Sequence, residues 1–211
     1  MAKKAFSLES VLFMRPVLDR LSDSRTLITL YSWSLRIIAG FTFLGGLVLT
    51  GGIVWGVAKM WSGLSGGQGL KVFFGVVFVV IFILGMNIVI VNIQLLRAND
   101  IASLPVVKIF PLNQIVVIVT KMTGEITASV YAGFSLALSL ITWIGATSIL
   151  EYLPIRSLPG MSMAAAGSAF VSGLLILLFG GVISFLALYG SYVLAESEEV
   201  LVMIARNTKK G

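Results

Sequence analysis

Cysteine and histidine are both absent from this sequence of 211 residues, and charged residues are scarce. These absences exclude thiolate chemistry, Cys/His zinc sites, histidine-ligated haem and imidazole acid-base catalysis. Charged side chains make up 11% of the chain, against about 25% in soluble domains. Hydrophobic residues make up 58%, and the mean hydropathy is +1.04. The composition predicts an integral membrane protein without a cofactor or a separate soluble catalytic domain.

The net charge of +6 does not indicate a nucleic-acid-binding protein. The lysines and arginines flank the apolar runs, where such residues set the orientation of membrane helices and meet anionic lipid head groups. We therefore expect membrane lipids as partners, together with further copies of the chain or other membrane subunits, and no nucleic acid.

The chain contains four long runs without a charged residue. The first two cover residues 37–58 and 72–96, with 22 and 25 residues. The third covers residues 126–150, and the fourth span is expected at about 165–194 within a longer uncharged stretch. A bilayer core of about 30 Å requires about 20 helical residues, and a helix satisfies its own backbone in lipid.

These runs predict an all-α integral membrane protein with four transmembrane helices arranged as two hairpins. The first hairpin covers residues 37–96 and the second covers residues 126–195. Neither run of the first hairpin alternates polar with apolar residues as a strand of a membrane barrel would.

The remaining segments are expected to lie in the cytoplasm or at the membrane interface. They are an N-terminal segment (1–36), a connector (97–125) and a tail (196–211). Residues 13–23 have the two-faced pattern of an amphipathic lead-in helix. Residues 109–120 are uncharged but too short to span, which leaves an interfacial helix and a re-entrant loop as alternatives.

The basic residues also predict an orientation. Twelve lysines and arginines lie in the N-terminal segment, the connector and the tail, against three in the links within the hairpins. The positive-inside rule then places both termini and the connector in the cytoplasm. The expected location is the inner (plasma) membrane of a bacterium.

Small residues recur at helical spacing along the first, third and fourth spans, and we expect them to be contact faces between helices. Among them, Gly52 and Gly56 form a small-xxx-small pair. The candidate packing residues are Gly45, Gly52, Gly56, Ala132, Ser135, Ser139, Gly173, Gly180 and Ser184.

The second span ends in amides, with Asn87, Asn92 and Gln94 close to its polar end. Asn87 and Gln94 are seven residues apart and therefore share a face. Buried amides either line a path for a solute or bond across helices, the latter being worth about 0.6 kcal/mol each. We expect them to make polar contacts between helices.

The two halves of the chain look related. Ala39-Gly40-Phe41 and Ala132-Gly133-Phe134 stand at similar positions in the first and third spans. The first half combines the expected lead-in helix and a glycine-rich hairpin with a polar end to the second span, Leu95-Leu96-Arg97-Ala98-Asn99-Asp100. This arrangement resembles a family of small uncharacterised bacterial hairpin membrane proteins, here doubled. The glutamate of that family's second span is replaced by Asn92 or Gln94. The resemblance implies no activity.

No residue pattern supports catalysis, because every acidic and every basic side chain lies outside the four uncharged runs. Serines such as Ser135 and Ser184 have no histidine, lysine or aspartate near them in the membrane to act as a base. The cluster of Glu196, Glu198 and Glu199 is more typical of a solvated helix end than of a cation site.

The expected function is therefore that of a non-enzymatic accessory, scaffold or assembly subunit of a membrane complex or homo-oligomer. A passive channel or transporter subunit is the alternative. A lipid-binding or membrane-shaping protein is the third.

Overall fold

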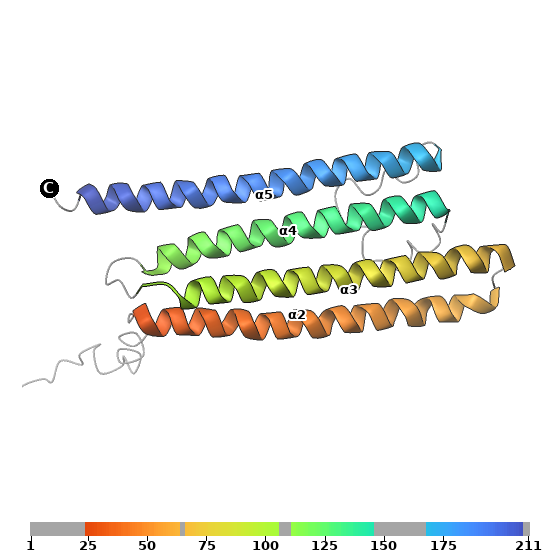
Figure 1. Ribbon diagram of the computed structural model, residues 1–211, viewed down its shortest axis with the longest axis horizontal. Coiled ribbons are helices and arrows are strands. Elements are labelled where there is room, and N and C mark those ends of the chain that lie inside the picture. Colours follow the sequence, from red (N-terminus) through yellow and green to blue (C-terminus); the bar gives the residue numbers. More distant parts are fainter. Residues whose placement is uncertain (1–23, 64–65, 106–110, 146–167, 209–211) are drawn as a thin grey trace, which may run out of the picture.

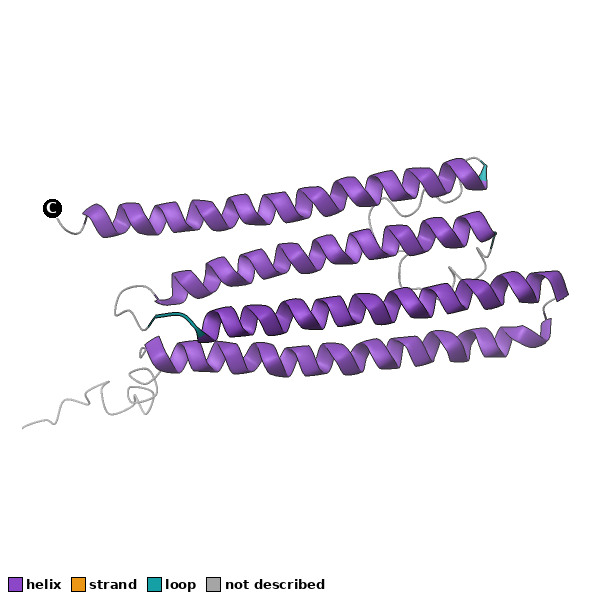
Figure 2. Cartoon of the chain, in the orientation of Figure 1, coloured by secondary structure: helices purple, strands orange, loops and turns teal. Residues whose placement is uncertain are grey.

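The computed structural model describes residues 24–63, 66–105, 111–145 and 168–208, and every regular element in these ranges is helical (Figures 1 and 2). The elements are α2 (Ser24–Met60), the short 3-10 helix η2 (Trp61–Gly63), α3 (Gly66–Ala102), α4 (Pro111–Ile144) and α5 (Ala169–Thr208). The four α-helices are long and apolar enough to cross a membrane. The prediction of four such helices without strands is confirmed for the described part of the chain.

Each helix is longer than a bilayer core requires. α3 has 37 residues, which corresponds to about 55 Å at the usual helical rise, against a core of about 30 Å. The charge-free run of α3 ends at Arg97, and that of α4 begins after Glu125. These two side chains bond to each other, so the surplus lengths of both helices project from the same end of the bundle. We call this end, where α3 and α5 finish and α2 and α4 begin, the polar end.

The helices lie side by side in chain order, and their directions alternate (Figure 1). α4 and α5 share the most extensive contact. Ser139 Oγ donates a hydrogen bond to the carbonyl of Gly173 at 2.8 Å, and Ser184 Oγ donates one to the carbonyl of Ala128 at 2.7 Å. The residue number rises from 128 to 139 along α4 while that of the bonded partner falls from 184 to 173 along α5. The two helices are therefore antiparallel.

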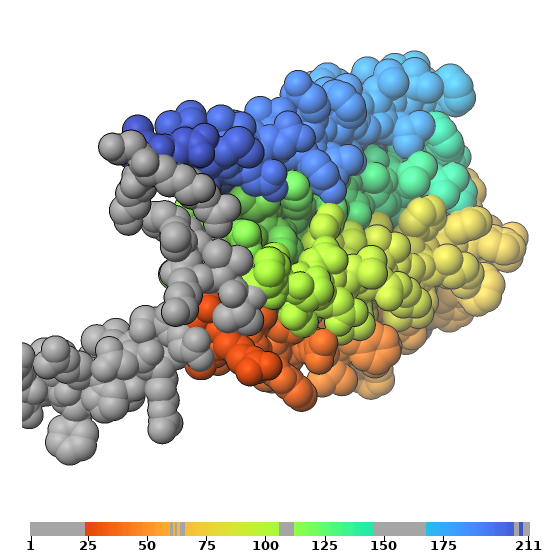
Figure 3. All heavy atoms as spheres, turned by 60° about the vertical axis from the view of Figure 1, so that its left-hand side comes forward, coloured from red at the N-terminus to blue at the C-terminus, as the bar shows by residue number. Residues whose placement is uncertain are grey.

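α4 is the most enclosed helix. In its most apolar stretch, 44% of the residues are buried, against 11% in α2. Figure 3 shows α4 set back between α3 and α5. Many large apolar side chains of α2 and α5 are accordingly exposed rather than packed against the other helices.

The buried apolar residues form two clusters. One cluster joins all four helices away from the polar end, and it contains Ile53, Val57, Val72, Val79, Ile83, Leu138, Ile141 and Ile176. The other lies at the polar end and contains Ile28, Leu35, Ala98, Ile101 and Ile115. In a membrane such clusters stabilise the fold by van der Waals packing, because lipid tails are as apolar as the side chains themselves.

The helix ends differ from the expected boundaries. Pro111 occupies the first turn of α4, a position that tolerates proline because it needs no backbone donor. The helix then continues without a break, so residues 111–125 belong to α4 rather than to a separate connector segment. Gly145, with a φ of 73°, ends α4, because a left-handed glycine is a common helix stop.

α5 shows the same extension at its far end. Ser168 precedes the helix, and its Oγ accepts a hydrogen bond from the backbone N–H of Val171 at 3.5 Å, as an N-cap does. The helix runs through the residues assigned to the tail as far as Thr208. The lead-in helix expected at residues 13–23 lies outside the described residues.

Candidate functional site

The polar end contains a cluster of ionisable side chains from three helices. Arg97 lies in α3, Glu125 in α4 and Tyr192 in α5. Their side chains meet because α4 is antiparallel to both α3 and α5. The uncharged runs of α3 and α5 therefore end at the same depth at which the uncharged run of α4 begins. We call these three residues the Arg97 cluster.

Arg97 is the centre of the cluster. Its Nε donates a hydrogen bond to Oε2 of Glu125 at 3.0 Å, and its Nη2 contacts Oε1 of the same carboxylate. Its Nη1 donates to Oδ2 of Asp100, one turn further along α3, at 2.8 Å. Two-pronged pairing of a guanidinium with a carboxylate fixes orientation as well as adding energy.

Tyr192 completes the cluster. Its hydroxyl donates to Oε1 of Glu125 at 2.6 Å and accepts a hydrogen bond from Nη2 of Arg97 at 3.2 Å. The side chains of Arg97 and Glu125 are only 21% and 18% exposed. The cluster therefore links α3, α4 and α5 through charges that are partly withdrawn from solvent.

A second ion pair lies beside the first. Nζ of Lys121 on α4 is 3.4 Å from Oε1 of Glu199 on α5, a long contact, and the Glu199 side chain is 55% exposed. The same ammonium lies 5.7 Å from the centre of the Tyr192 ring. The ion pair of Lys121 with Glu199 is therefore longer and more exposed than the ion pair of Arg97 with Glu125.

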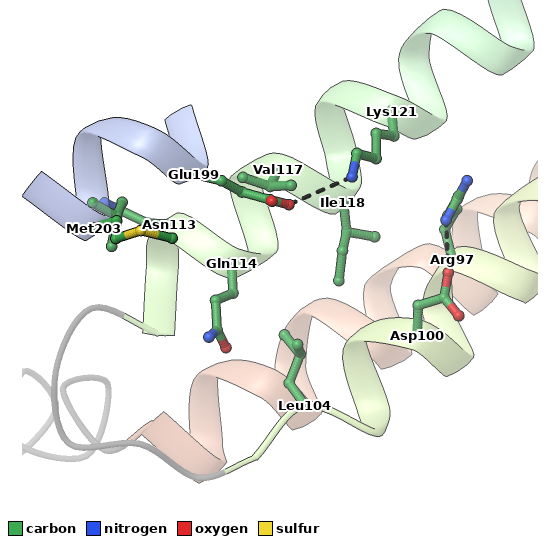
Figure 4. Close-up of a pocket in the computed structure, with 11 residues that line it drawn as sticks. Arg97, Asp100, Leu104, Asn113, Gln114, Val117, Ile118, Lys121, Glu199 and Met203 are labelled. Carbon is green, nitrogen blue, oxygen red and sulfur yellow. Dashed lines mark hydrogen bonds and ion pairs between the residues drawn. The ribbon is translucent and has the colours of Figure 1, made fainter. Parts of the chain in front are cut away.

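A cavity of about 530 Å³ lies between these ion pairs (Figure 4). Its polar lining comes from Arg97, Asp100, Asn113, Gln114, Lys121 and Glu199. Its apolar lining comes from Leu104, Val117, Ile118, Val202 and Met203. A cavity of this size can hold a ligand of several hundred daltons, and we call it the polar-end cavity.

The lining of the polar-end cavity can bind charged groups. Arg97 and Lys121 can neutralise an anionic group, and Asp100 and Glu199 can accept hydrogen bonds from an ammonium. In the part of the chain that the structure describes, no three acidic side chains gather closely enough to hold a metal ion. Glu196, Glu198 and Glu199 lie on α5 without forming such a group.

The amides named from the sequence lie apart from this site, between α2 and α3. Asn87 is buried, and its Nδ2 donates to the carbonyl of Phe43 at 3.1 Å. Gln94 is also buried, and its Nε2 donates to Oγ1 of Thr42 at 3.2 Å. Asn92 is exposed on α3. Two of the three amides thus bond across helices.

The small residues of the second half lie at the contact of α4 with α5. A Cβ added at Gly173 would overlap the indole of Trp143, and one added at Gly180 would overlap the side chain of Ser135. Ser139 and Ser184 donate the hydrogen bonds described above. Ala132 is half-buried, and its carbonyl accepts a bond from Ser135 Oγ at 2.9 Å.

The glycines named in the first half are placed differently. Gly45 and Gly52 are exposed, and a Cβ added at either would meet no other helix or side chain within 4 Å in the described part of the chain. Gly56 is half-buried. Among the residues that the structure describes, Gly45 and Gly52 are therefore not contact residues, and a packing role for them requires a partner.

Sequence reasoning missed the glycines that make close contacts elsewhere. A Cβ at Gly46 would overlap the amide of Asn87, one at Gly124 the side chain of Ser191, and one at Gly133 the side chain of Met86. It also missed the Arg97 cluster. The sequence did contain a signal for this cluster. Arg97 follows the second uncharged run and Glu125 precedes the third, so the two side chains lie at the same depth when these helices are antiparallel.

Comparisons with known proteins add no relative: no family model, no curated protein and no solved structure matches this chain.

Proposed function

We propose that this chain is a non-enzymatic integral membrane subunit that assembles with other membrane helices through an exposed face of α2. The partner is a second copy of the chain or another membrane subunit. The proposal rests on one observation, which is the residue pattern along the outer face of α2.

That face carries large and small side chains in alternation. Phe41, Gly45, Val48, Gly52 and Trp55 follow one another at spacings of four and three residues, so they form one stripe along the helix. We call it the α2 stripe. Phe41, Val48 and Trp55 are 70%, 76% and 66% exposed, among the highest values for large apolar side chains in the described residues.

The presence of Gly45 and Gly52 on this face favours contact with a partner helix over contact with lipid. Glycine in a helix interior is less favourable than alanine by about 1 kcal/mol, and no packing against the other described helices compensates for this at Gly45 or Gly52. Small residues between bulky ones allow a second helix to approach closely and insert its side chains. A face exposed only to lipid has no need of them.

A conducting path through one chain has less support. The contact between α3 and α4 near Met86 holds a cavity of only about 10 Å³, lined by apolar side chains and Gly133. The buried amides Asn87 and Gln94 donate to α2 rather than facing an open space.

The proposal includes a membrane orientation. Both hairpins cross the inner membrane of a bacterium, and both termini lie in the cytoplasm. The distribution of twelve against three basic residues supports this orientation, as does the gathering of Arg36, Arg97 and Glu125 at the polar end, where Arg36 Nη2 donates to Asn99 at 3.0 Å.

The test compares Gly52→Leu with Gly181→Leu. Both glycines lie in open space on an outer helix, but only Gly52 belongs to the α2 stripe. Native mass spectrometry and size-exclusion chromatography in mild detergent should show a smaller assembly for Gly52→Leu alone, with unchanged unfolding of the single chain. The proposal would be rejected if both variants kept the wild-type assembly, or if the wild type were monomeric and captured no stoichiometric membrane partner.

A further inference from the structure

We propose that the polar-end cavity binds the head group of a zwitterionic phospholipid that carries a primary ammonium, the phosphatidylethanolamine class. The inference depends on the membrane placement given above but not on assembly through the α2 stripe. It is argued from the position, lining and charges of the cavity.

The position of the cavity matches head-group depth. Arg97 ends the uncharged run of α3, and Lys121 lies one turn before Glu125, which precedes the uncharged run of α4. Both basic residues line the cavity. A lipid whose acyl chains lie beside the apolar runs would therefore hold its phosphate and ammonium at the level of the cavity.

The lining matches an amphiphile. Leu104, Val117 and Ile118 provide an apolar part, and in Figure 4 the side chains of Leu104, Gln114 and Ile118 are directed into one space. Among the described residues, the amides of Asn113 and Gln114 make no hydrogen bond. Their N–H groups are thus free to bond to phosphate or ester oxygens.

The charges favour a zwitterion over an anion. Two cations and two carboxylates line the cavity, namely Arg97, Lys121, Asp100 and Glu199, so its formal charge is zero. Arg97 is already engaged by Glu125. The ion pair of Lys121 with Glu199 is a long contact of 3.4 Å, and a lipid phosphate can take the place of Glu199 there.

Glu199, once displaced from Lys121 by the phosphate, can bind the ammonium group of the same lipid. Glu199 and Asp100 are 55% and 49% exposed and can accept hydrogen bonds from an incoming ammonium. A primary ammonium has three N–H donors, whereas the trimethylated ammonium of a choline lipid has none. The cavity should therefore distinguish the two zwitterionic head groups.

The experiment measures lipid retention by the full-length protein, using native mass spectrometry and lipid titration in detergent. The probes are phosphatidylethanolamine, phosphatidylcholine and phosphatidylglycerol with identical acyl chains. We expect phosphatidylethanolamine to bind about tenfold more tightly than the other two, the effect of about one charge-assisted hydrogen bond. Soluble glycerophosphoethanolamine should compete only weakly, because it lacks the acyl chains.

Glu199→Gln should reduce the preference for phosphatidylethanolamine about tenfold by the same reasoning. Lys121→Gln should instead weaken the binding of all three lipids about tenfold, because they share the phosphate that Lys121 would bind. Their matched controls are Lys71→Gln and Glu196→Gln, exposed residues of the same types that do not line the cavity. Gln114→Trp, which fills the cavity without removing a charge, should abolish the preference. Circular dichroism and unfolding in detergent establish that each variant is folded.

Several results would overturn the inference. Tighter binding of phosphatidylglycerol would identify an anion site, and equal retention of all three lipids would identify non-specific annular lipid. Equal binding of the soluble head group would identify a soluble ligand. If a charge variant does not fold, the wild-type lipid preference and Gln114→Trp still decide the question. Lipid titration of Gly52→Leu separates the two proposals, because loss of assembly should leave the lipid preference intact.

Discussion

Asn87 on α3 lies directly against Gly46 on α2, at the point where its amide donates to the carbonyl of Phe43. A Cβ at Gly46 would occupy the space of that amide. The neighbouring Gly45 faces open space. The contact of α2 with α3 at Asn87 thus depends on one of two adjacent glycines.

Gly46→Ala should therefore destabilise the protein by about 1–3 kcal/mol, as overpacked contacts do. Gly45→Ala should be neutral or slightly stabilising, because alanine favours a helix by up to about 1 kcal/mol. Unfolding by SDS in mixed micelles measures both. Asn87→Ala should suppress the effect of Gly46→Ala by vacating the space, and equal behaviour of the two glycine variants would contradict the contact.

A second pair of adjacent glycines tests the contact of α4 with α5. Gly180 is closed in by Ser135 and by the carbonyl of Tyr131, whereas Gly181 is open. Gly180→Ala should cost about 1–3 kcal/mol of stability, and Gly181→Ala should cost nothing. Thermal unfolding followed by circular dichroism compares them. A larger loss for Gly181→Ala would mean that α5 is rotated relative to the structure.

The Arg97 cluster should contribute cooperatively to stability. Tyr192→Phe removes a hydrogen bond to a carboxylate and Glu125→Gln removes the charge that Arg97 bonds, each at a cost of about 1.5–3 kcal/mol. The double variant should lose less than the sum of the two, because both changes remove the same contact. Unfolding free energies of the four proteins give the coupling, and Glu196→Gln serves as the exposed control. Strict additivity would show that Tyr192 and Glu125 act independently.

Orientation can be read from single cysteines, since the natural sequence contains none. Lys59→Cys and Glu196→Cys place exposed thiols at opposite ends of the bundle. With both termini in the cytoplasm, a membrane-impermeant maleimide should label Lys59→Cys in intact spheroplasts and Glu196→Cys only after lysis. The reverse pattern would invert the orientation.

The protein alone should not conduct ions, because the contact of α3 with α4 near Met86 is apolar and nearly filled. We expect flux from proteoliposomes to equal that from empty liposomes in a fluorescent ion-flux assay. Flux that is present with the wild type and lost with Asn87→Leu would instead favour the channel.

Part of this architecture follows from local composition. A run without charge that is longer than the bilayer core must be helical in lipid, whatever surrounds it, so four apolar helices could be predicted from residues 37–58 and the three later runs. The contact role of Gly180 and Ser135 was also within reach, because small residues at helical spacing are common where membrane helices meet.

The sequence by itself determined the apolar core of each of the four helices and which residue types could allow close contact. Only the tertiary structure decided that Gly46 rather than Gly45 meets α3, and that Arg97, Glu125 and Tyr192 meet at one level. The physical reason is that hydropathy adds up along a single segment, whereas a contact depends on the rotation of each helix about its axis and on its register against its neighbours. Rotation and register are set jointly by all the side chains in the interface, so they belong to the packed bundle and not to any one run.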